Sequence, residues 1–180
     1  MWQQLDLLLD RKTQESEREF YGLIGLVAVR FARLEAQLTE LLSKIINPDN
    51  DLLAATLTED LFFVKTVEMI KKIGRMRTID NKLMHEIISG ANSLRKERNN
   101  YMHGIWDIKL KDNGYVTATC SHKKVSFEQT GSRKLWSHGY VPITVTLNGL
   151  KGTAMKLESL SKKVQRLIDD IKENLEGIEE

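Results

Sequence analysis

The sequence predicts a mainly α-helical protein: an antiparallel helical bundle with a small β-hairpin or sheet inserted before the last helix. Apolar residues recur at helical spacing over long stretches, only two prolines are present, and one segment changes to the period of strands. A chain of 180 residues suits one domain with a well-filled core. We therefore expect a single helical domain over residues 1–180, with residues 105–146 as a β insert.

Two helices are predicted in the first part of the chain. The first has an apolar seam that alternates spacings of four and three, made of Phe20, Ile24, Val27, Phe31, Leu34, Leu38, Leu41 and Ile45. Asn47-Pro48-Asp49 is expected to end this helix. Thr58 is the predicted N-cap of the second helix, which Gly74 weakens. Its expected apolar face consists of Phe62, Met69, Ile73 and Met76.

A third helix is predicted from about Asp80 to His103, with Gly104 as a left-handed C-cap. Strands should follow, because Trp106, Ile108 and Leu110 alternate with polar residues and Asn113-Gly114 is typical of a hairpin. Tyr115–Cys120 and Val141–Val145 are the next expected strands, whereas residues 121–139 are polar and show no clear pattern. The last helix has the apolar face Leu157, Leu160, Val164, Leu167, Ile171 and Leu175.

Composition limits the classes of function. A net charge of +2 does not by itself indicate a nucleic-acid binder, although a local basic patch would suffice for one. Cys120 is the only cysteine, so no internal disulfide and no cysteine zinc site is expected, and a reducing compartment fits. The apolar run Leu5–Leu9 is short and broken by Asp6, and no run approaches a membrane span. We expect a cytoplasmic protein without membrane segments, metal or cofactor.

The third predicted helix carries an unusual charge on its apolar stripe. Met84, Ile87, Ala91 and Leu94 lead, after four more residues, to Arg98. A guanidinium stays charged at any ordinary pH, so burial of Arg98 would demand partners. Asn99 and His103 are four residues apart and neighbour each other on the helix surface. The Asn99 amide could hydrogen-bond the His103 imidazole and fix its tautomer.

The stretch from Arg98 to His103, R-N-N-Y-M-H, resembles the R-N-x-x-x-H signature of HEPN domains. Its flanks are similar too, because Leu94-Arg95 precede the stretch and Gly104 and Trp106 follow it, as in many such domains. The resemblance covers the helical bundle in architecture and about ten residues in specific sequence.

This resemblance implies a metal-independent endoribonuclease of a toxin–antitoxin, abortive-infection or other phage-defence system. It implies a homodimer with a composite active site, an RNA substrate, and an antitoxin or defence-system partner. The ribose 2′-hydroxyl attacks the adjacent phosphate and leaves a cyclic phosphate. Arg98 would hold the phosphoryl oxygens, His103 would transfer protons, and Asn99 would orient the pair.

Other polar residues are weaker candidates. Glu35 lies at the edge of the first helix's seam and could support the site by pairing with Arg98, or it is a solvated flank charge. The RNA-binding candidates are basic residues of the two middle helices, namely Arg75, Arg77, Arg95 and Lys96. The alternative for each is a solvated face balanced by nearby acids.

Two alternatives to catalysis stay open. Arg98 and His103 could be structural, since a histidine at a helix C-terminus is favourable through the helix dipole alone. The chain could also be a catalytically inactive HEPN-like module that binds a nucleotide, RNA or a protein partner. Toxins of the family that pair with a minimal nucleotidyltransferase antitoxin carry tyrosine where this sequence has Ile105, so regulation by modifying such a tyrosine is not expected. His85, His122 and His138 lack metal-ligand spacing.

Overall fold

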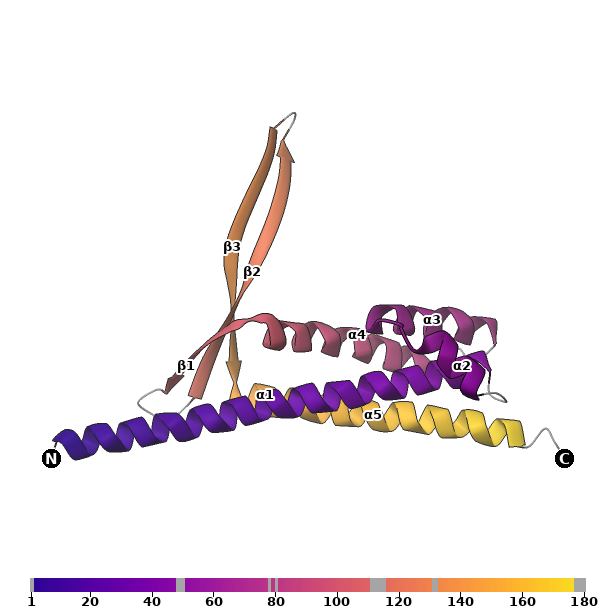
Figure 1. Ribbon diagram of the computed structural model, residues 1–180, viewed down its shortest axis with the longest axis horizontal. Helices are drawn as coiled ribbons and strands as arrows, with labels where there is room; N and C mark the ends of the chain where they lie inside the picture. Colours follow the sequence, from indigo (N-terminus) through magenta and orange to yellow (C-terminus); the bar gives the residue numbers. More distant parts are fainter. Residues whose placement is uncertain are drawn as a thin grey trace. The chain divides into compact units, whose positions relative to one another are not determined.

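The structure is a computed structural model, and it describes residues 2–47, 51–77, 79, 81–110, 116–130 and 133–176. The elements, labelled in Figure 1, are α1 (Trp2–Ile46), α2 (Asp51–Thr58), α3 (Phe63–Met76), α4 (Lys82–His103), β1 (Ile105–Leu110), β2 (Val116–Thr130), β3 (Arg133–Thr146) and α5 (Leu147–Glu176). The predicted fold class is confirmed: the protein is mainly helical, with a small antiparallel sheet before its last helix.

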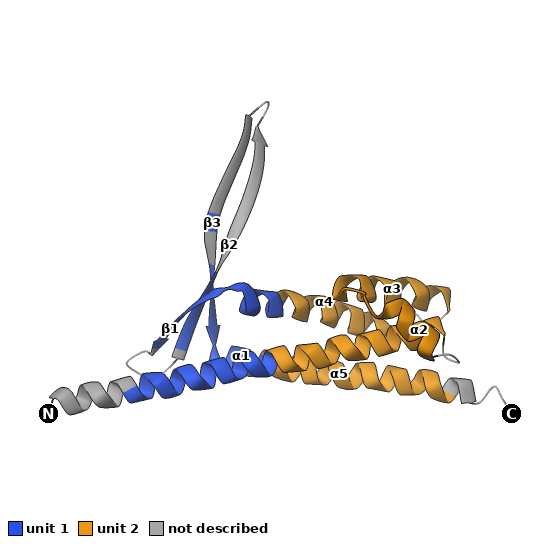
Figure 2. Ribbon diagram, in the orientation of Figure 1, with its two compact units in different colours: residues 1–27, 97–152 blue, residues 28–96, 153–180 orange. Residues whose placement is uncertain are grey.

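The chain divides into two compact units (Figure 2). Unit 1 consists of Met1–Val27 and Glu97–Gly152, and unit 2 of Ala28–Lys96 and Thr153–Glu180. Each of the helices α1, α4 and α5 is divided, with one stretch in unit 1 and the rest in unit 2. Among the described residues, the regular elements of unit 2 are all helices, whereas unit 1 contains the sheet.

The core of unit 2 follows the predicted apolar seams. On α1, Phe31 and Leu34 are at most 2% exposed, and the Phe31 ring lies 5.1 Å from that of Phe63 on α3. Further buried apolar side chains of unit 2 lie on α1, α4 and α5 and include Leu38, Leu41, Leu42, Ile45, Met84, Ile87, Ala91, Leu94, Leu157, Val164, Leu167 and Ile168. Helical spacing places these residues on one side of each helix, so their burial stabilises the bundle.

The predicted start of the second helix is wrong. Thr58 is the last residue of a separate helix, α2, and its hydroxyl donates to the Ala54 carbonyl at 3.1 Å. This bond back to the preceding turn satisfies the hydroxyl within the helix, in place of an N-cap. The Thr58 and Ser43 hydroxyl oxygens also lie 3.1 Å apart, which fixes α2 to α1 inside unit 2.

The predicted apolar face of the next helix is also wrong. Phe62 and Met76 are 86% and 83% exposed, and α3 instead buries Thr66, Val67, Ile70 and Gly74. The reason lies in a close approach, because a Cβ added to Gly74 would lie 2.6 Å from the Met84 sulfur. The small glycine lets the end of the Met84 side chain pack directly against α3 at this point.

Helix α4 begins slightly later than predicted and ends where predicted. The Asn81 side-chain oxygen accepts a hydrogen bond from the Met84 amide at 2.9 Å, so Asn81 caps the first turn. His103 is the last helical residue. The predicted left-handed conformation of Gly104 is wrong, because its φ lies outside that region. Glycine is needed here because a Cβ would collide with the Cys120 sulfur.

The sheet of unit 1 has the order β1-β2-β3 with antiparallel neighbours. Leu110 pairs with Val116, and the predicted hairpin residues Asn113-Gly114 lie outside the described residues. Strands β2 and β3 are longer than predicted, pairing from Thr117 with Thr146 to Thr130 with Arg133. The polar segment 121–139 thus extends both strands, and its lack of apolar alternation explains why the sequence does not reveal them.

A small apolar cluster holds unit 1 together. Phe20, Ala118, Val145 and Leu150 are buried in it, and the half-buried Trp106 packs edge-on against Phe20 with ring centroids 5.0 Å apart. The cluster joins α1, the sheet and the start of α5, and it lies beside Tyr101 in the last turn of α4. None of the helices among the described residues is both long and apolar enough to cross a membrane.

Candidate active site at the end of α4

The R-N-N-Y-M-H stretch forms the last turns of α4, within unit 1. Arg98 and Asn99 are half-buried, whereas His103 is exposed. Arg98 continues the stripe that buries Leu94 one turn earlier, so its charged group lies at the margin of packed surface. A helix end with an exposed imidazole and a partly desolvated guanidinium is chemically suited to act on a phosphodiester.

Asn99 orients Arg98 and not His103 as far as the described contacts show. The Arg98 Nη1 donates a hydrogen bond to the Asn99 side-chain oxygen at 3.2 Å. The expected contact between the Asn99 amide and the His103 imidazole does not appear among the described hydrogen bonds. Asn99 therefore restricts the guanidinium, and its predicted effect on the imidazole tautomer stays a prediction.

Helix geometry separates the two principal candidates. Five residues advance an α-helix by about 140° beyond a full turn, so Arg98 and His103 leave α4 in different directions. Asn99 and His103 differ by only about 40° and share a face. A single α4 thus presents the imidazole and the guanidinium on different sides.

Two side chains from the sheet support this helix end. The Cys120 thiol donates to the Asn100 carbonyl at 3.0 Å, and the Trp106 indole nitrogen donates to the Tyr101 carbonyl at 3.0 Å. Both carbonyls belong to the last turn of α4, and the carbonyls of a last turn receive no N–H from within the helix. Burial raises the pKa of the Cys120 thiol above its ordinary value and keeps it a donor.

These supporting residues were not predicted as part of the site. Alternation in the strands indicates that Trp106 faces the core, but the donor role of its indole depends on where β1 leaves the helix. The position of Cys120 depends on register, since it pairs with Trp106 across β1 and β2. A buried cysteine one strand away from a motif carries no sequence signal for this contact.

Glu35 lies half-buried on α1 in unit 2, whereas Arg98 belongs to unit 1. Its pairing with Arg98 stays a prediction.

The basic candidates lie in unit 2 and differ in environment. Arg75 and Lys96 are exposed, on α3 and α4. Arg77 donates from Nη2 to the Ile46 carbonyl at 2.7 Å, so its guanidinium satisfies the C-terminal end of α1. Arg95 is half-buried, and its Nε has no hydrogen-bond acceptor in the described structure. RNA binding by these residues stays a prediction, and Arg77 has a structural contact as well.

Within the described ranges, no group of three or more histidine, cysteine, aspartate or glutamate side chains could hold a metal ion.

Comparison with known proteins gives no relative: no family model, no curated protein and no solved structure matches this chain.

Proposed function

We propose that this protein is a metal-independent endoribonuclease of the HEPN type, with Arg98 and His103 as its catalytic residues. The observation that carries the proposal is the last turn of α4, where an exposed His103 follows an Arg98 whose guanidinium is restrained by Asn99. The turn is itself anchored through its carbonyls to Cys120 and Trp106. Such anchoring keeps catalytic groups in a defined geometry.

The chemistry needs only groups of these kinds. A neutral histidine accepts the proton of the ribose 2′-hydroxyl, whose oxygen attacks the adjacent phosphorus. The bond from phosphorus to the 5′-oxygen breaks, and that oxygen takes a proton from a protonated histidine. The products are a 2′,3′-cyclic phosphate and a free 5′-hydroxyl. The Arg98 guanidinium stabilises the charge that grows on the phosphoryl oxygens.

A second copy of the chain would complete the site. Arg98 and His103 of one α4 diverge by about 140°, so one helix does not aim both at one phosphate. Two-fold pairing of two α4 ends would set Arg98 of one protomer beside His103 of the partner subunit. We therefore propose a homodimer with a composite site, acting on RNA in the cytoplasm as part of a toxin–antitoxin or phage-defence system.

The test is incubation of the full-length protein with a mixed RNA pool in EDTA, followed by analysis of fragment ends. Native protein should release fragments with 2′,3′-cyclic phosphate ends, and His103→Ala should release none. His85→Ala is the matched control, because His85 is an exposed histidine of the same helix in unit 2. This variant should cleave RNA like the native protein. Intact RNA with native protein, or equal cleavage by His103→Ala, would contradict the proposal.

A further inference from the structure

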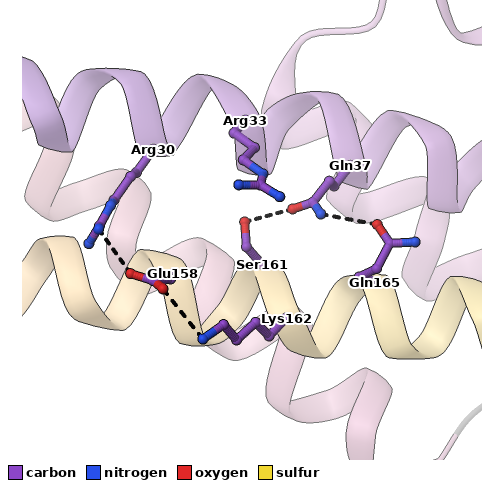
Figure 3. Close-up of a pocket in the computed structure, with 7 residues that line it drawn as sticks. All are labelled: Arg30, Arg33, Gln37, Glu158, Ser161, Lys162 and Gln165. Atoms are coloured by element: carbon purple, nitrogen blue, oxygen red, sulfur yellow. Dashed lines mark hydrogen bonds and ion pairs between the residues drawn. The ribbon is translucent and has the colours of Figure 1, made fainter.

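Unit 2 contains a pocket of about 290 Å³ between α1 and α5, which is lined by polar and charged residues and is remote in sequence from the R-N-N-Y-M-H stretch (Figure 3). Its lining side chains are Arg30, Arg33 and Gln37 from α1, and Glu158, Ser161, Lys162 and Gln165 from α5. We propose that this pocket binds the phosphate group of a small ligand, either free phosphate or a phosphate monoester such as a nucleoside monophosphate. This binding activity is separate from the proposed cleavage of RNA.

Charge favours an anion in this pocket. Arg30, Arg33 and Lys162 are cations, and Glu158 is the one carboxylate among the lining side chains. Glu158 already serves two of the cations, with its oxygens 2.9 Å from Arg30 Nη2 and 3.4 Å from Lys162 Nζ. The pocket therefore has a local excess of positive charge, although the whole chain carries only +2.

Arg33 is the one lining cation that does not pair with Glu158 in the described part of the chain. Its guanidinium extends from α1 toward Ser161, between the other labelled side chains (Figure 3). The described residues provide no ion pair or hydrogen bond for Arg33, in contrast to Arg30, which also donates to the Ala154 carbonyl at 2.9 Å. A guanidinium offers five N–H donors in a fork that matches two phosphoryl oxygens.

The hydrogen bonds of the pocket floor leave some N–H donors unused. Ser161 Oγ donates to Gln37 Oε1 at 2.6 Å, and Gln37 Nε2 donates to Gln165 Oε1 at 3.3 Å. Gln165 Nε2 then donates to Asp169 at 3.0 Å. The Gln37 and Gln165 amide nitrogens each keep a second N–H that can donate to a phosphoryl oxygen. Such a surface suits a ligand that is rich in acceptors.

Burial makes this floor fixed. Gln37 and Ser161 are only 9% and 6% exposed, so their hydrogen bonds are held away from water. A charge bound beside such groups is attracted more strongly than at a fully solvated surface. The pocket volume of about 290 Å³ lies just below the roughly 300–1,000 Å³ range of small-molecule sites, which fits a small phosphate ligand better than a large cofactor.

The experiment is isothermal titration calorimetry of the full-length protein in low-salt chloride buffer, with inorganic phosphate and with adenosine 5′-monophosphate as probes. Both probes should bind the native protein. Arg33→Gln should weaken both by about tenfold or more, since it removes charge-assisted hydrogen bonds. Glu158→Gln should strengthen both, because it removes the carboxylate that competes with phosphate for Arg30 and Lys162.

Arg166→Gln is the matched control, because Arg166 is an exposed arginine of α5 that does not line the pocket. The Arg166→Gln variant should bind both probes as the native protein does. The Arg33→Gln variant should fold, since the exposed Arg33 side chain has no partner among the described residues. Tighter binding of the nucleotide would identify a phosphate monoester as the ligand, and equal affinity would identify free phosphate. Absence of binding at about 10 mM of either probe would overturn the proposal, as would equal affinities of native protein and Arg33→Gln.

Discussion

Helix α4 has two parts, residues 82–96 and residues 97–103, which differ in what their inward-facing positions carry. The first part buries Met84, Ile87, Ala91 and Leu94 in unit 2. The second part, in unit 1, has no buried residue and places the half-buried Arg98 on the continuation of that stripe. Its backbone is held by side-chain donors from the sheet, Cys120 and Trp106.

Different forces hold the two parts of α4 in place. The first part is stabilised by burial of its apolar stripe, where an unpaired charge would be costly. The second part is fixed by hydrogen bonds from Cys120 and Trp106 to its carbonyls, and its His103 side chain is exposed. Substitutions in the first part should therefore change stability, whereas those of Arg98 and His103 should change activity.

The largest effect on stability is expected for Ile87→Ala. Ile87 is fully buried, so truncation removes apolar contacts and leaves a cavity that costs about 2–5 kcal/mol of unfolding free energy. Denaturant unfolding followed by circular dichroism measures this loss. A change below about 0.5 kcal/mol, which is typical of surface positions, would show that the first part of α4 is not a structural core.

A smaller loss is expected for Gly104→Ala, directly after α4. The new methyl group meets the Cys120 sulfur and lies 3.1 Å from the Asn100 carbonyl oxygen, and such overpacking costs about 1–3 kcal/mol. Unfolding of Gly104→Ala combined with Cys120→Ala should show that the second substitution recovers part of the loss.

The control for this prediction is Gly22→Ala on α1, where an added Cβ has nothing within 4 Å. It should be neutral or stabilise the helix, because alanine is the better helix former. Equal unfolding free energies of Gly104→Ala and the native protein would show that the sheet does not approach the helix end closely.

The smallest effect concerns the surface of the first part of α4. Lys163 Nζ lies 2.7 Å from Glu86 Oε2, and this hydrogen bond and charge hold the pKa of Glu86 below its ordinary value of 4.5. A lowered pKa stabilises the fold above pH 4.5, and this stabilisation is lost as pH falls through the lowered pKa. Lys163→Ala should raise the Glu86 pKa toward 4.5 in an NMR titration, while Lys162→Ala should not. Equal Glu86 pKa values in both variants would contradict the assigned cause.

Much of the fold could be predicted because burial follows periodicity. The seams of α1, α4 and α5 are regular, and the seam residues Phe31, Leu34, Leu38, Leu41 and Ile45 are buried as expected. Helix α2 could not be predicted, since it exposes Leu52, Leu53 and Leu57 and buries the smaller Ala54 and Thr58. Its apolar pattern therefore does not mark the face that packs.

The site was predictable only in part. The motif marks Arg98 and His103, but the partner of Asn99 depends on a side-chain rotamer that spacing does not determine. The pocket between α1 and α5 joins residues such as Gln37 and Ser161, which are 124 positions apart. Neither residue belongs to a sequence motif, so only the packing of α1 against α5 reveals their contact.

The catalytic role proposed for Arg98 is tested most directly by the RNA cleavage rate of Arg98→Gln. The unfolding free energy of the same protein is measured in parallel. Glutamine keeps a polar side chain of intermediate length but removes the charge that would stabilise the transition state. We expect a cleavage rate lowered by about a hundredfold or more, with an unfolding free energy within about 1 kcal/mol of that of the native protein. A native cleavage rate, or a fall in stability as large as that of Ile87→Ala, would show that Arg98 serves the fold and not the chemistry.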